Sequence, residues 1–387
     1  MNLRYTNINV ECSDLCNMRC IMCNQHHNSG FMHGKDLRSS FLPREGFVKL
    51  LNDIRHAGLD IGCFTPYWSG ESTFHPDFKF FMKTLFERNR QSPFFKRFIF
   101  NTNGLAFDRE TSDIFLDYAM YIKENKLGDY NFNLTFSLDS ITTGTFSKIK
   151  CIKGGFFRKV MKNIDYLITK RSRLGLSMPN VTFSFVIMNE NVAEAGKFLK
   201  YWSGYLAKQD SPFDVITEIS HPKGKDAIFF RTCDDSRQKY ADENLKLKRD
   251  FLKMIGLADC APADTAHMDL KSHMKSVKQG RRPCFQLWNM CIISTSGEVT
   301  PCCKDNFLQL SLGSIKDTSI GAMWLGDNLK ELRLSQIRGE FDQCKFCSTC
   351  MNPPGGTMRD DEVVSYLNLI NEPGLIGAYL NRVRGVK

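Results

Sequence analysis

The sequence lacks the features of membrane-spanning and exported proteins. Its 387 residues contain no run of apolar residues as long as the roughly 18 to 20 that a bilayer-crossing helix requires. The N-terminal segment, Met1 to Val10, has no charged stretch followed by an apolar stretch and a cleavage site, which excludes a secretory signal there. We therefore expect no membrane partner and a cytoplasmic location.

A long basic stripe is also missing. The formal net charge is +10, but Lys and Arg are scattered along the chain, with short runs only at residues 170–171 and 281–282. A nucleic-acid-binding surface normally gathers its positive charge on one face or helix. The scattered pattern indicates a solvated surface, and we expect no nucleic-acid partner.

Cysteine, by contrast, is abundant. The chain has 15 cysteines, four of them within residues 12–23 and seven within residues 284–350. An odd count without an export signal argues against a disulfide framework. Two tight clusters in a reducing compartment predict two metal sites, with structural zinc as an alternative for the second.

Strands and helices alternate over residues 1–220, the pattern of an α/β protein with a mostly parallel sheet. Six strand–helix units fit an open or partial barrel better than a closed eight-stranded one. The predicted strands are at residues 6–11, 60–67, 97–101, 131–139, 181–187 and 213–219, and the predicted helices at residues 43–58, 77–90, 111–123, 155–171 and 192–206.

The pattern changes after this first domain. Residues 221–283 are charged and irregular, with one helix near Asp242 to Ile255, and we interpret them as a connector that covers the substrate. Residues 284–352 are rich in cysteine and turns, as expected of a small domain organised by metal. Residues 353–387 form a C-terminal tail with at most one helix.

Cys16, Cys20 and Cys23 form a C-x3-C-x2-C run in a loop directly after the first predicted strand. Three thiolates can bind three irons of a cubane cluster and leave the fourth iron without a protein ligand. An iron that is free in this way can bind a substrate. The alternative is a zinc loop completed by one of three nearby histidines.

This spacing resembles the signature of the radical S-adenosylmethionine (radical SAM) superfamily. In that family the fourth iron chelates the amino and carboxylate groups of S-adenosylmethionine. Ser69-Gly70-Glu71 resembles the family's Gly-Gly-Glu motif, which holds the methionine amino group, with Ser69 in place of the first glycine.

Three more segments resemble family positions at the carboxyl ends of barrel strands, where such folds build their sites. Thr102 and Asn103 resemble a turn near the methionine moiety. Ser137 and Asp139, on one face of the strand at residues 131–139, resemble the groups that bind the ribose hydroxyls. Asn189 would lie beside the adenine and the carboxylate of S-adenosylmethionine.

The second cluster begins with Cys284, Gly297 and Cys302 in a C-x9–15-G-x4-C arrangement that resembles the SPASM and twitch domains of radical SAM enzymes. Its closing run is Cys344, Cys347 and Cys350, fewer cysteines than a full SPASM domain has. The resemblance implies one auxiliary [4Fe–4S] cluster held by Cys284, Cys302, Cys344 and Cys347, with Cys350 competing for one of the last two places. Four-thiolate zinc remains the alternative.

The resemblance implies an oxidoreductase. The expected reaction is reductive cleavage of S-adenosylmethionine to a 5′-deoxyadenosyl radical, which abstracts a hydrogen atom from the substrate. We expect a carbohydrate-like or other small-molecule substrate, because the 15 residues before Cys16 leave no room for the domain with which peptide-modifying members bind a leader peptide. We also expect net dehydrogenation assisted by the auxiliary cluster. The alternative is radical-based modification of a peptide or protein side chain by cross-linking, epimerisation or oxidation. Epimerisation of the substrate would need a hydrogen donor, for which Cys260 is the candidate. An electron donor such as flavodoxin or ferredoxin is the expected partner.

Overall fold

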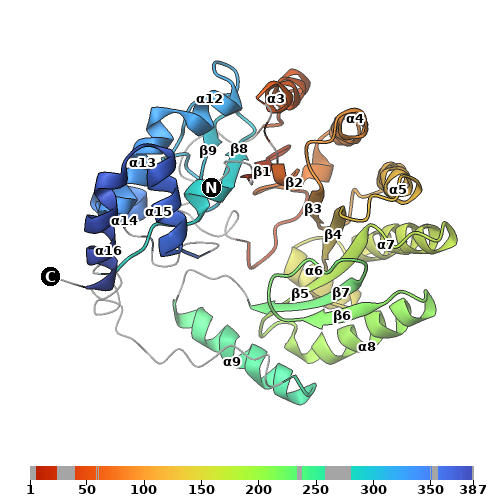
Figure 1. Cartoon of the computed structure of the whole chain (residues 1–387). Helices are drawn as coiled ribbons and strands as arrows, with labels where there is room; N and C mark the ends of the chain where they lie inside the picture. The colour runs from red at the N-terminus through yellow and green to blue at the C-terminus, as the bar shows by residue number, and fades with distance from the viewer. Residues whose placement is uncertain are drawn as a thin grey trace. The chain divides into compact units, whose positions relative to one another are not determined.

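The computed structural model describes residues 6–23, 40–57, 59, 61–232, 238–257, 280–348, 350 and 356–385. Contacts divide the chain into two compact units, both of which appear in the cartoon of Figure 1. The first unit comprises Met1–Val10, Leu42–Cys63 and Asp264–Lys387, and the second comprises Glu11–Phe41 and Phe64–Ala263. None of the described helices combines the length and the apolar character needed to cross a membrane.

The second unit is built on a parallel sheet. Its strands follow the order β6-β7-β5-β4-β3, and every neighbouring pair among them is parallel. Strand β2 (Ile61–Thr65) crosses the division between the units, and its residue Phe64 pairs with Phe98 of β3. The bounds are β3 Arg97–Thr102, β4 Asn131–Ser137, β5 Asn180–Ile187, β6 Phe213–Ile216 and β7 Asp226–Thr232.

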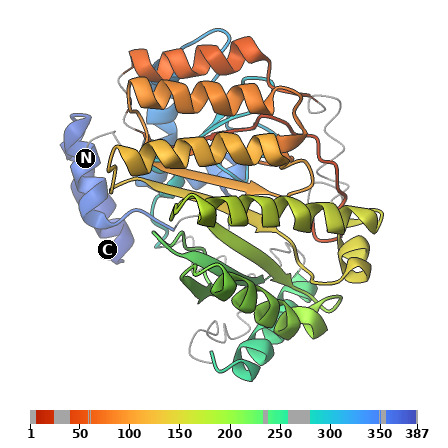
Figure 2. The same cartoon turned by 90° about the vertical axis from the view of Figure 1, so that its right-hand side faces the viewer.

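Four helices lie side by side over one face of these strands in Figure 2: α4 (Phe78–Gln91), α5 (Arg109–Glu124), α7 (Gly155–Arg173) and α8 (Val192–Lys208). Aromatic rings fill the space between α4, α5 and the sheet. Phe86 stacks on Tyr118 at 4.3 Å between ring centroids, and Phe98 packs edge-on against Phe132 at 5.0 Å. Offset and edge-to-face ring pairs of this kind add to the free energy gained by apolar burial. The unit also contains η1 (Ser72–Phe74), α6 (Thr143–Lys150) and α9 (Gln238–Met254).

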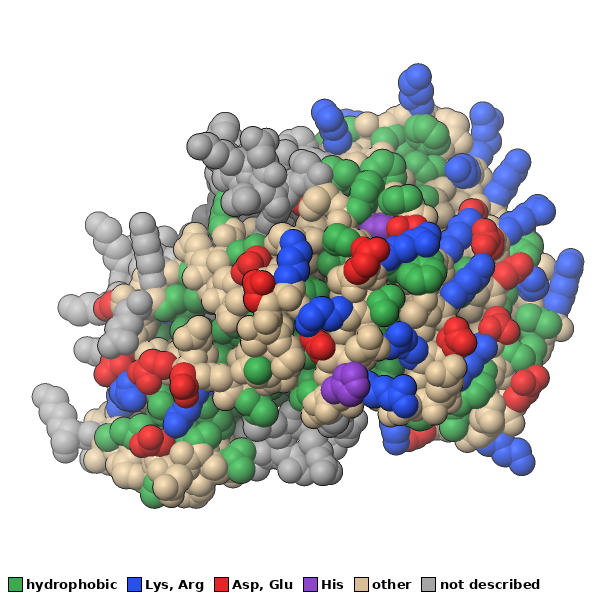
Figure 3. Space-filling model, turned by 90° about the horizontal axis from the view of Figure 1, so that it is seen from above, with side chains coloured by type: hydrophobic (Ala, Val, Ile, Leu, Met, Phe, Trp, Pro, Cys, Tyr) green, Lys and Arg blue, Asp and Glu red, His purple; other side chains and the backbone are tan. Residues whose placement is uncertain are grey.

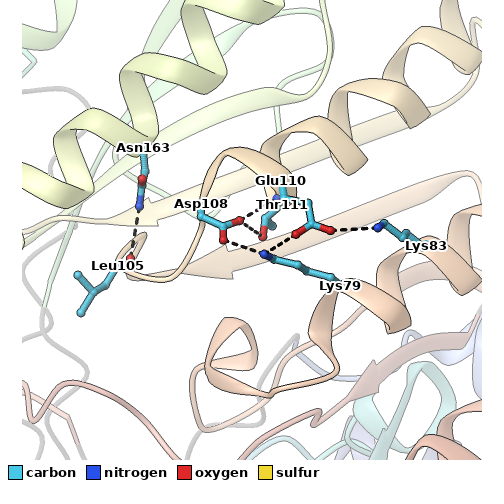
Figure 4. A network of polar contacts seen from close by, with 7 residues as sticks. All are labelled: Lys79, Lys83, Leu105, Asp108, Glu110, Thr111 and Asn163. Atoms are coloured by element: carbon cyan, nitrogen blue, oxygen red, sulfur yellow. Dashed lines mark hydrogen bonds and ion pairs between the residues drawn. The ribbon is translucent and has the colours of Figure 1, made fainter.

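Polar contacts fix the helices at the carboxyl end of β3, as Figure 4 shows. Lys79 on α4 binds both Asp108, at 2.7 Å, and Glu110, at 2.8 Å, at the start of α5. On α7, the buried amide of Asn163 donates to the carbonyl oxygens of Gly104 and Leu105 at 2.9 and 3.3 Å. These contacts position the turn that follows β3, where Thr102 and Asn103 lie.

The first unit has a small sheet and a helical layer. Strand β1 (Thr6–Val10) pairs in parallel with β8 (Met290–Ile293), which pairs in antiparallel fashion with β9 (Val299–Thr300). Leu287, Trp288, Leu334, Tyr366 and other side chains form its hydrophobic core. Its helices are α3 Arg44–His56, α11 Gln286–Asn289, α12 Ile320–Leu325, α13 Asp327–Arg338, η3 Phe341–Gln343, α14 Lys345–Ser348, α15 Asp360–Leu369, η4 Pro373–Leu375 and α16 Ile376–Arg384.

Three elements differ from the sequence-based expectation. Strand β7 lies between β5 and β6, within the stretch predicted to be a connector with one helix. Residues 226–230 are all buried, and residues 227–230 form a continuous apolar run without the alternation that marks a half-exposed strand. Helix α6 was not expected either. The prediction of at most one helix in the tail is wrong, because α15 and α16 both pack on the core of the first unit.

Candidate functional site

Cys16, Cys20 and Cys23 lie in one loop of the second unit, and all three thiols are free and half-buried. Burial raises the pKa of Cys16 to about 12, and the charges of Glu71, Cys20 and Cys23 contribute to the same effect. The three thiols are therefore close enough to interact. Among the described residues, no three His, Cys, Asp or Glu side chains surround a single ion position. A three-thiolate donor set fits a cubane cluster, in which each thiolate binds a separate iron.

Gly70 packs directly against this cysteine loop. A Cβ atom at Gly70 would lie 2.2 Å from the carbonyl oxygen of Ser13 and 2.7 Å from that of Leu15, a contact that only glycine avoids. The next residue, Glu71, donates its backbone N–H to the same Leu15 oxygen at 2.9 Å. Ser69, which replaces the first glycine of the family motif, donates its hydroxyl to the buried carboxylate of Glu11.

The Glu71 carboxylate joins two loops. Its Oε1 accepts from the hydroxyls of Thr73 at 2.6 Å and Thr102 at 2.8 Å, and its Oε2 accepts from the backbone N–H of Asn103 at 2.7 Å. The side chain is only 5% exposed, and burial raises its pKa although these hydrogen bonds lower it. Since Oε1 is fully occupied, Oε2 is the oxygen with acceptor capacity left for a ligand ammonium.

Asn103 completes the link back to the cysteines. Its Nδ2 donates to Asn17 Oδ1 at 2.7 Å and lies 3.9 Å from the sulfur of Cys16. The structure thus brings together the cysteine loop, Gly70-Glu71 and Thr102-Asn103, which are three of the segments predicted from sequence to share a site. Asn17, Thr73 and Glu11 were not predicted.

Helix α6 holds the other side of the cysteine loop. The backbone N–H groups of Arg19 and Ile21 donate to the carbonyl oxygens of Lys150 and Ile149, at 3.1 and 2.9 Å. These are last-turn carbonyls of α6, which have no partner within the helix. The loop is therefore bound to the end of a helix that the sequence did not reveal.

Lys150 is buried and forms an ion pair with Asp139, each side chain being 2% exposed. Burial alone would lower the pKa of Lys150, but the charge of Asp139, followed by that of Cys20, raises it to about 12. A buried cation thus lies within the electrostatic range of the cysteine sulfurs. Nothing in the sequence spacing marked Lys150, because its partner and its helix are both consequences of the fold.

The predicted strand face of Ser137 and Asp139 is not formed. Strand β4 ends at the half-buried Ser137, and Asp139 has a positive φ of +61°, so the two side chains do not continue one strand alternation. The Asp139 carboxylate accepts from Val186 N–H at 2.7 Å in addition to its pairing with Lys150. Asn189 is exposed and donates to Glu243 on α9, whereas the buried Asn191 donates to the carbonyl oxygen of Asp139 at 2.9 Å. Cys260 lies outside the described residues.

The second set of cysteines gathers within the first unit. Cys302 and Cys347 belong to one buried cluster, against which Cys344 packs. Burial raises the pKa of Cys284 to about 11, with additional influence from Cys350 and Cys303. Gly297, the glycine of the C-x9–15-G-x4-C arrangement, has φ +89° in the turn between β8 and β9. Cys303 joins this set without having been predicted, while Cys291 is 1% exposed within β8.

A single amide connects two of the predicted ligands. Gln336 on α13 is 1% exposed; its Oε1 accepts from the backbone N–H of Cys284 at 2.7 Å, and its Nε2 donates to the sulfur of Cys347 at 3.4 Å. Arg281 donates to the carbonyl oxygen of Cys347 at 2.9 Å. The sulfurs of Cys344 and Cys347 also share a hydrogen bond, which lowers the pKa of Cys344. This arrangement fits a closed cluster with several thiolate ligands.

Comparison with known proteins agrees with this geometry. Residues 284–351 match the SPASM family, described as an iron–sulfur cluster-binding domain. SuiB from Streptococcus suis, solved with S-adenosylmethionine, is similar in fold, with 12% identity over 96% of this chain and 76% of SuiB and a TM-score of 0.51. Native anSMEcpe with bound AdoMet has 15% identity over 97% of this chain and 99% of its own, with a TM-score of 0.50. The chain shares its fold with these two proteins, and residues 284–351 form a SPASM domain.

A further solved structure, BtrN in complex with AdoMet and 2-DOIA, has 14% identity over 90% of this chain and 93% of its own, with a TM-score of 0.46. No curated protein matches the sequence. The SPASM match confirms the prediction of an iron–sulfur cluster rather than zinc at the second cysteine set. SuiB and native anSMEcpe, two structures of the same fold, were both solved with S-adenosylmethionine bound.

Proposed function

We propose that the chain is a radical SAM oxidoreductase whose reactive site is the cysteine loop of the second unit. The observation that carries this proposal is the chain of contacts from Cys16 through Asn103 to Glu71 and back to Leu15. When bound at Cys16, Cys20 and Cys23, a [4Fe–4S] cluster would supply the electron that cleaves S-adenosylmethionine to methionine and a 5′-deoxyadenosyl radical, which then removes a hydrogen atom from the substrate.

The residues around the loop would bind and orient the cofactor. Glu71 Oε2 offers an acceptor for the methionine ammonium, and Thr102 and Asn103 hold that carboxylate in place. Ser137 and Asp139 remain our candidates for the ribose hydroxyls, and Asn189 for the adenine side. For Asp139 this role requires that the carboxylate bind the ribose while it stays paired with Lys150.

We further propose net dehydrogenation of a carbohydrate-like or other small molecule. The second cysteine set supports this through its donor count, which suffices for one auxiliary [4Fe–4S] cluster held by Cys284, Cys302, Cys344 and Cys347, with Cys350 or Cys303 as a competing ligand. Such a cluster, when bound, would accept the second electron of the oxidation.

Peptide modification is the second candidate, because SuiB, similar in fold, was also solved bound to the precursor peptide SuiA, with a TM-score of 0.50 to this chain. The test is anaerobic incubation of the reduced, cluster-loaded protein with S-adenosylmethionine and panels of aminocyclitols, sugars and peptides in D2O. Dehydrogenation predicts a product two hydrogens lighter without solvent deuterium at the attacked carbon. A product of unchanged mass apart from one deuterium would indicate epimerisation instead and contradict the dehydrogenase proposal.

A further inference from the structure

Exposed basic side chains gather where α6 meets α7. Between Asp139 and Asp165 the sequence contains no acidic residue, but it contains six Lys or Arg residues. One of them, Lys150, is buried. The other five are exposed, as is Arg19 of the cysteine loop. We call the six exposed residues the α6–α7 basic surface: Arg19, Lys148, Lys153, Arg158, Lys159 and Lys162.

No ion pair between described residues neutralises these charges. Within the described part of the chain, none of the six side chains forms an ion pair, whereas exposed lysines elsewhere in the unit do, as Lys79 and Lys83 do with Glu110. Glu194 on α8 contacts the start of α6, but its carboxylate accepts from the Ile141 N–H and from the hydroxyls of Thr142 and Thr145. The face drawn in Figure 3 carries charges of both signs, with Lys and Arg interspersed among Asp and Glu.

The α6–α7 basic surface is continuous with the cysteine loop. The N–H groups of Arg19 and Ile21 donate to the last carbonyls of α6, so Arg19 and the C-terminal end of α6 are in direct backbone contact. In Figure 2, α6 lies next to the N-terminal end of α7. A protein that docked on this surface would therefore lie against the loop that carries Cys16, Cys20 and Cys23.

An exposed aromatic ring provides an apolar centre. Phe156, in the first turn of α7, is 39% exposed and lies between Lys153 and Arg158 in sequence. Protein interfaces commonly combine an apolar core with a charged rim, and opposite charges steer the two partners together. The basic rim, the ring and the adjacent cysteine loop together fit an acidic redox protein better than an uncharged partner.

We propose that the α6–α7 basic surface is the docking site for an acidic one-electron donor protein of the flavodoxin class. This inference rests on the proposed function, because only a redox site at the cysteine loop requires such a donor. With a cluster held by Cys16, Cys20 and Cys23, one electron would pass from the reduced flavin of the donor to that cluster in each docking event. The flavin would be oxidised by one electron, the cluster would be reduced by one, and no bond to the protein would form or break.

The test is stopped-flow reduction of the cluster-loaded protein by an acidic flavodoxin in its hydroquinone form, without S-adenosylmethionine. We expect the variant Lys153→Glu/Arg158→Glu/Lys159→Glu to be reduced more slowly by roughly tenfold or more at low ionic strength, with the difference shrinking as salt is added. The matched control, Lys197→Glu/Lys200→Glu/Lys208→Glu, changes the same number of exposed charges on α8 and should remain near the wild-type rate.

Equal slowing of both variants would mean that net charge alone matters and would overturn the proposal. Dithionite, a small reductant, should reduce all three proteins alike. If the cysteine loop binds no cluster, the proposed function is wrong. In that case calorimetric titration of flavodoxin into the cluster-free wild type and the α6–α7 variant tests the docking site by itself. If flavodoxin bound the wild type and the α6–α7 variant alike, while an RNA oligonucleotide lost affinity for that variant only, the surface would be a nucleic-acid site and the proposal wrong.

Discussion

The two cysteine sites of this chain have different surroundings. Cys16, Cys20 and Cys23 are half-buried and lie among ionic groups, with Glu71, Asp139 and Lys150 within electrostatic range. The second set is largely buried among apolar side chains, and its described polar contacts include a neutral amide, backbone groups and one guanidinium, that of Arg281. Ionic groups around an incomplete donor set suit the binding of a charged ligand, whereas a fuller, buried set suits electron transfer alone.

The largest effect should come from removing the first donor set. Because we propose that these three thiolates hold one of two clusters, Cys16→Ala/Cys20→Ala/Cys23→Ala should lower the iron content from about eight to about four per chain. Iron and sulfide analysis after anaerobic reconstitution measures this. The matched control is Cys12→Ala, since Cys12 lies buried in the same segment and its thiol donates to the carbonyl of Pro66. A triple variant that kept all its iron would contradict the division into two sites.

Gly70→Ala should disturb the first site and leave the second intact. The added methyl group would collide with the backbone of Ser13 and Leu15, and backbone cannot move aside as a flexible side chain can. We expect loss of most of the iron of the first site, about four per chain, and retention of the other four. Gly128→Ala serves as control, because a Cβ atom there meets nothing within 4 Å. Normal iron content in the Gly70 variant would show that the loop can shift freely.

Glu71→Gln tests the ionic character of the first site. The change removes a charge worth about 1.5–3 kcal/mol in a hydrogen bond to an ammonium, so S-adenosylmethionine should bind roughly tenfold or more weakly. The amide also places an NH2 group opposite one of the N–H donors of Thr73 or Asn103, so the melting temperature must be measured alongside equilibrium dialysis. Thr102→Val, which removes one neutral hydrogen bond to the same carboxylate, is the control. Unchanged affinity in the Gln variant would limit Glu71 to a structural role.

The smallest effect concerns the second site. Gln336→Leu removes the hydrogen bond to the Cys347 sulfur, and hydrogen bonds to cluster sulfurs raise the reduction potential. We expect the auxiliary cluster to become harder to reduce by tens of millivolts, where about 59 mV equals a tenfold change for one electron. A redox titration followed by electron paramagnetic resonance measures both clusters at once, so the first cluster is an internal reference. Gln309→Leu, at an exposed position of the same domain, should change neither.

The sequence predicted the cysteine loop, the Gly70-Glu71 segment and most strands, because each of these depends on local residue order. It missed β7, whose buried residues show no alternation, and α6, whose Thr-rich and Gly-containing segment has low helix propensity. Lys150 and Gln336 could not be recognised for a related reason. Their roles depend on partners 11 and 52 residues away, Asp139 and the Cys284 N–H, which only the folded chain brings close.

The structure also differs from the sequence pattern at Ser137 and Asp139. Residues two apart in a strand share a face, so the sequence predicts that these two side chains point the same way, but the strand ends at Ser137. The backbone then turns through a residue with positive φ, and the carboxylate is directed to Lys150. A period-two pattern predicts a strand well but does not show where the strand ends.

We propose that S-adenosylmethionine is cleaved at the cysteine loop of the second unit and not at the SPASM domain. The most direct measurement is 5′-deoxyadenosine formed by the reduced, reconstituted chain under anaerobic conditions, compared with the Cys12→Ala and Cys16→Ala/Cys20→Ala/Cys23→Ala variants. The account predicts product from the wild type and the Cys12 variant and none from the triple variant, even though the triple variant retains the auxiliary cluster. Formation of 5′-deoxyadenosine by the triple variant, or its absence from a wild-type protein loaded with both clusters, would contradict it.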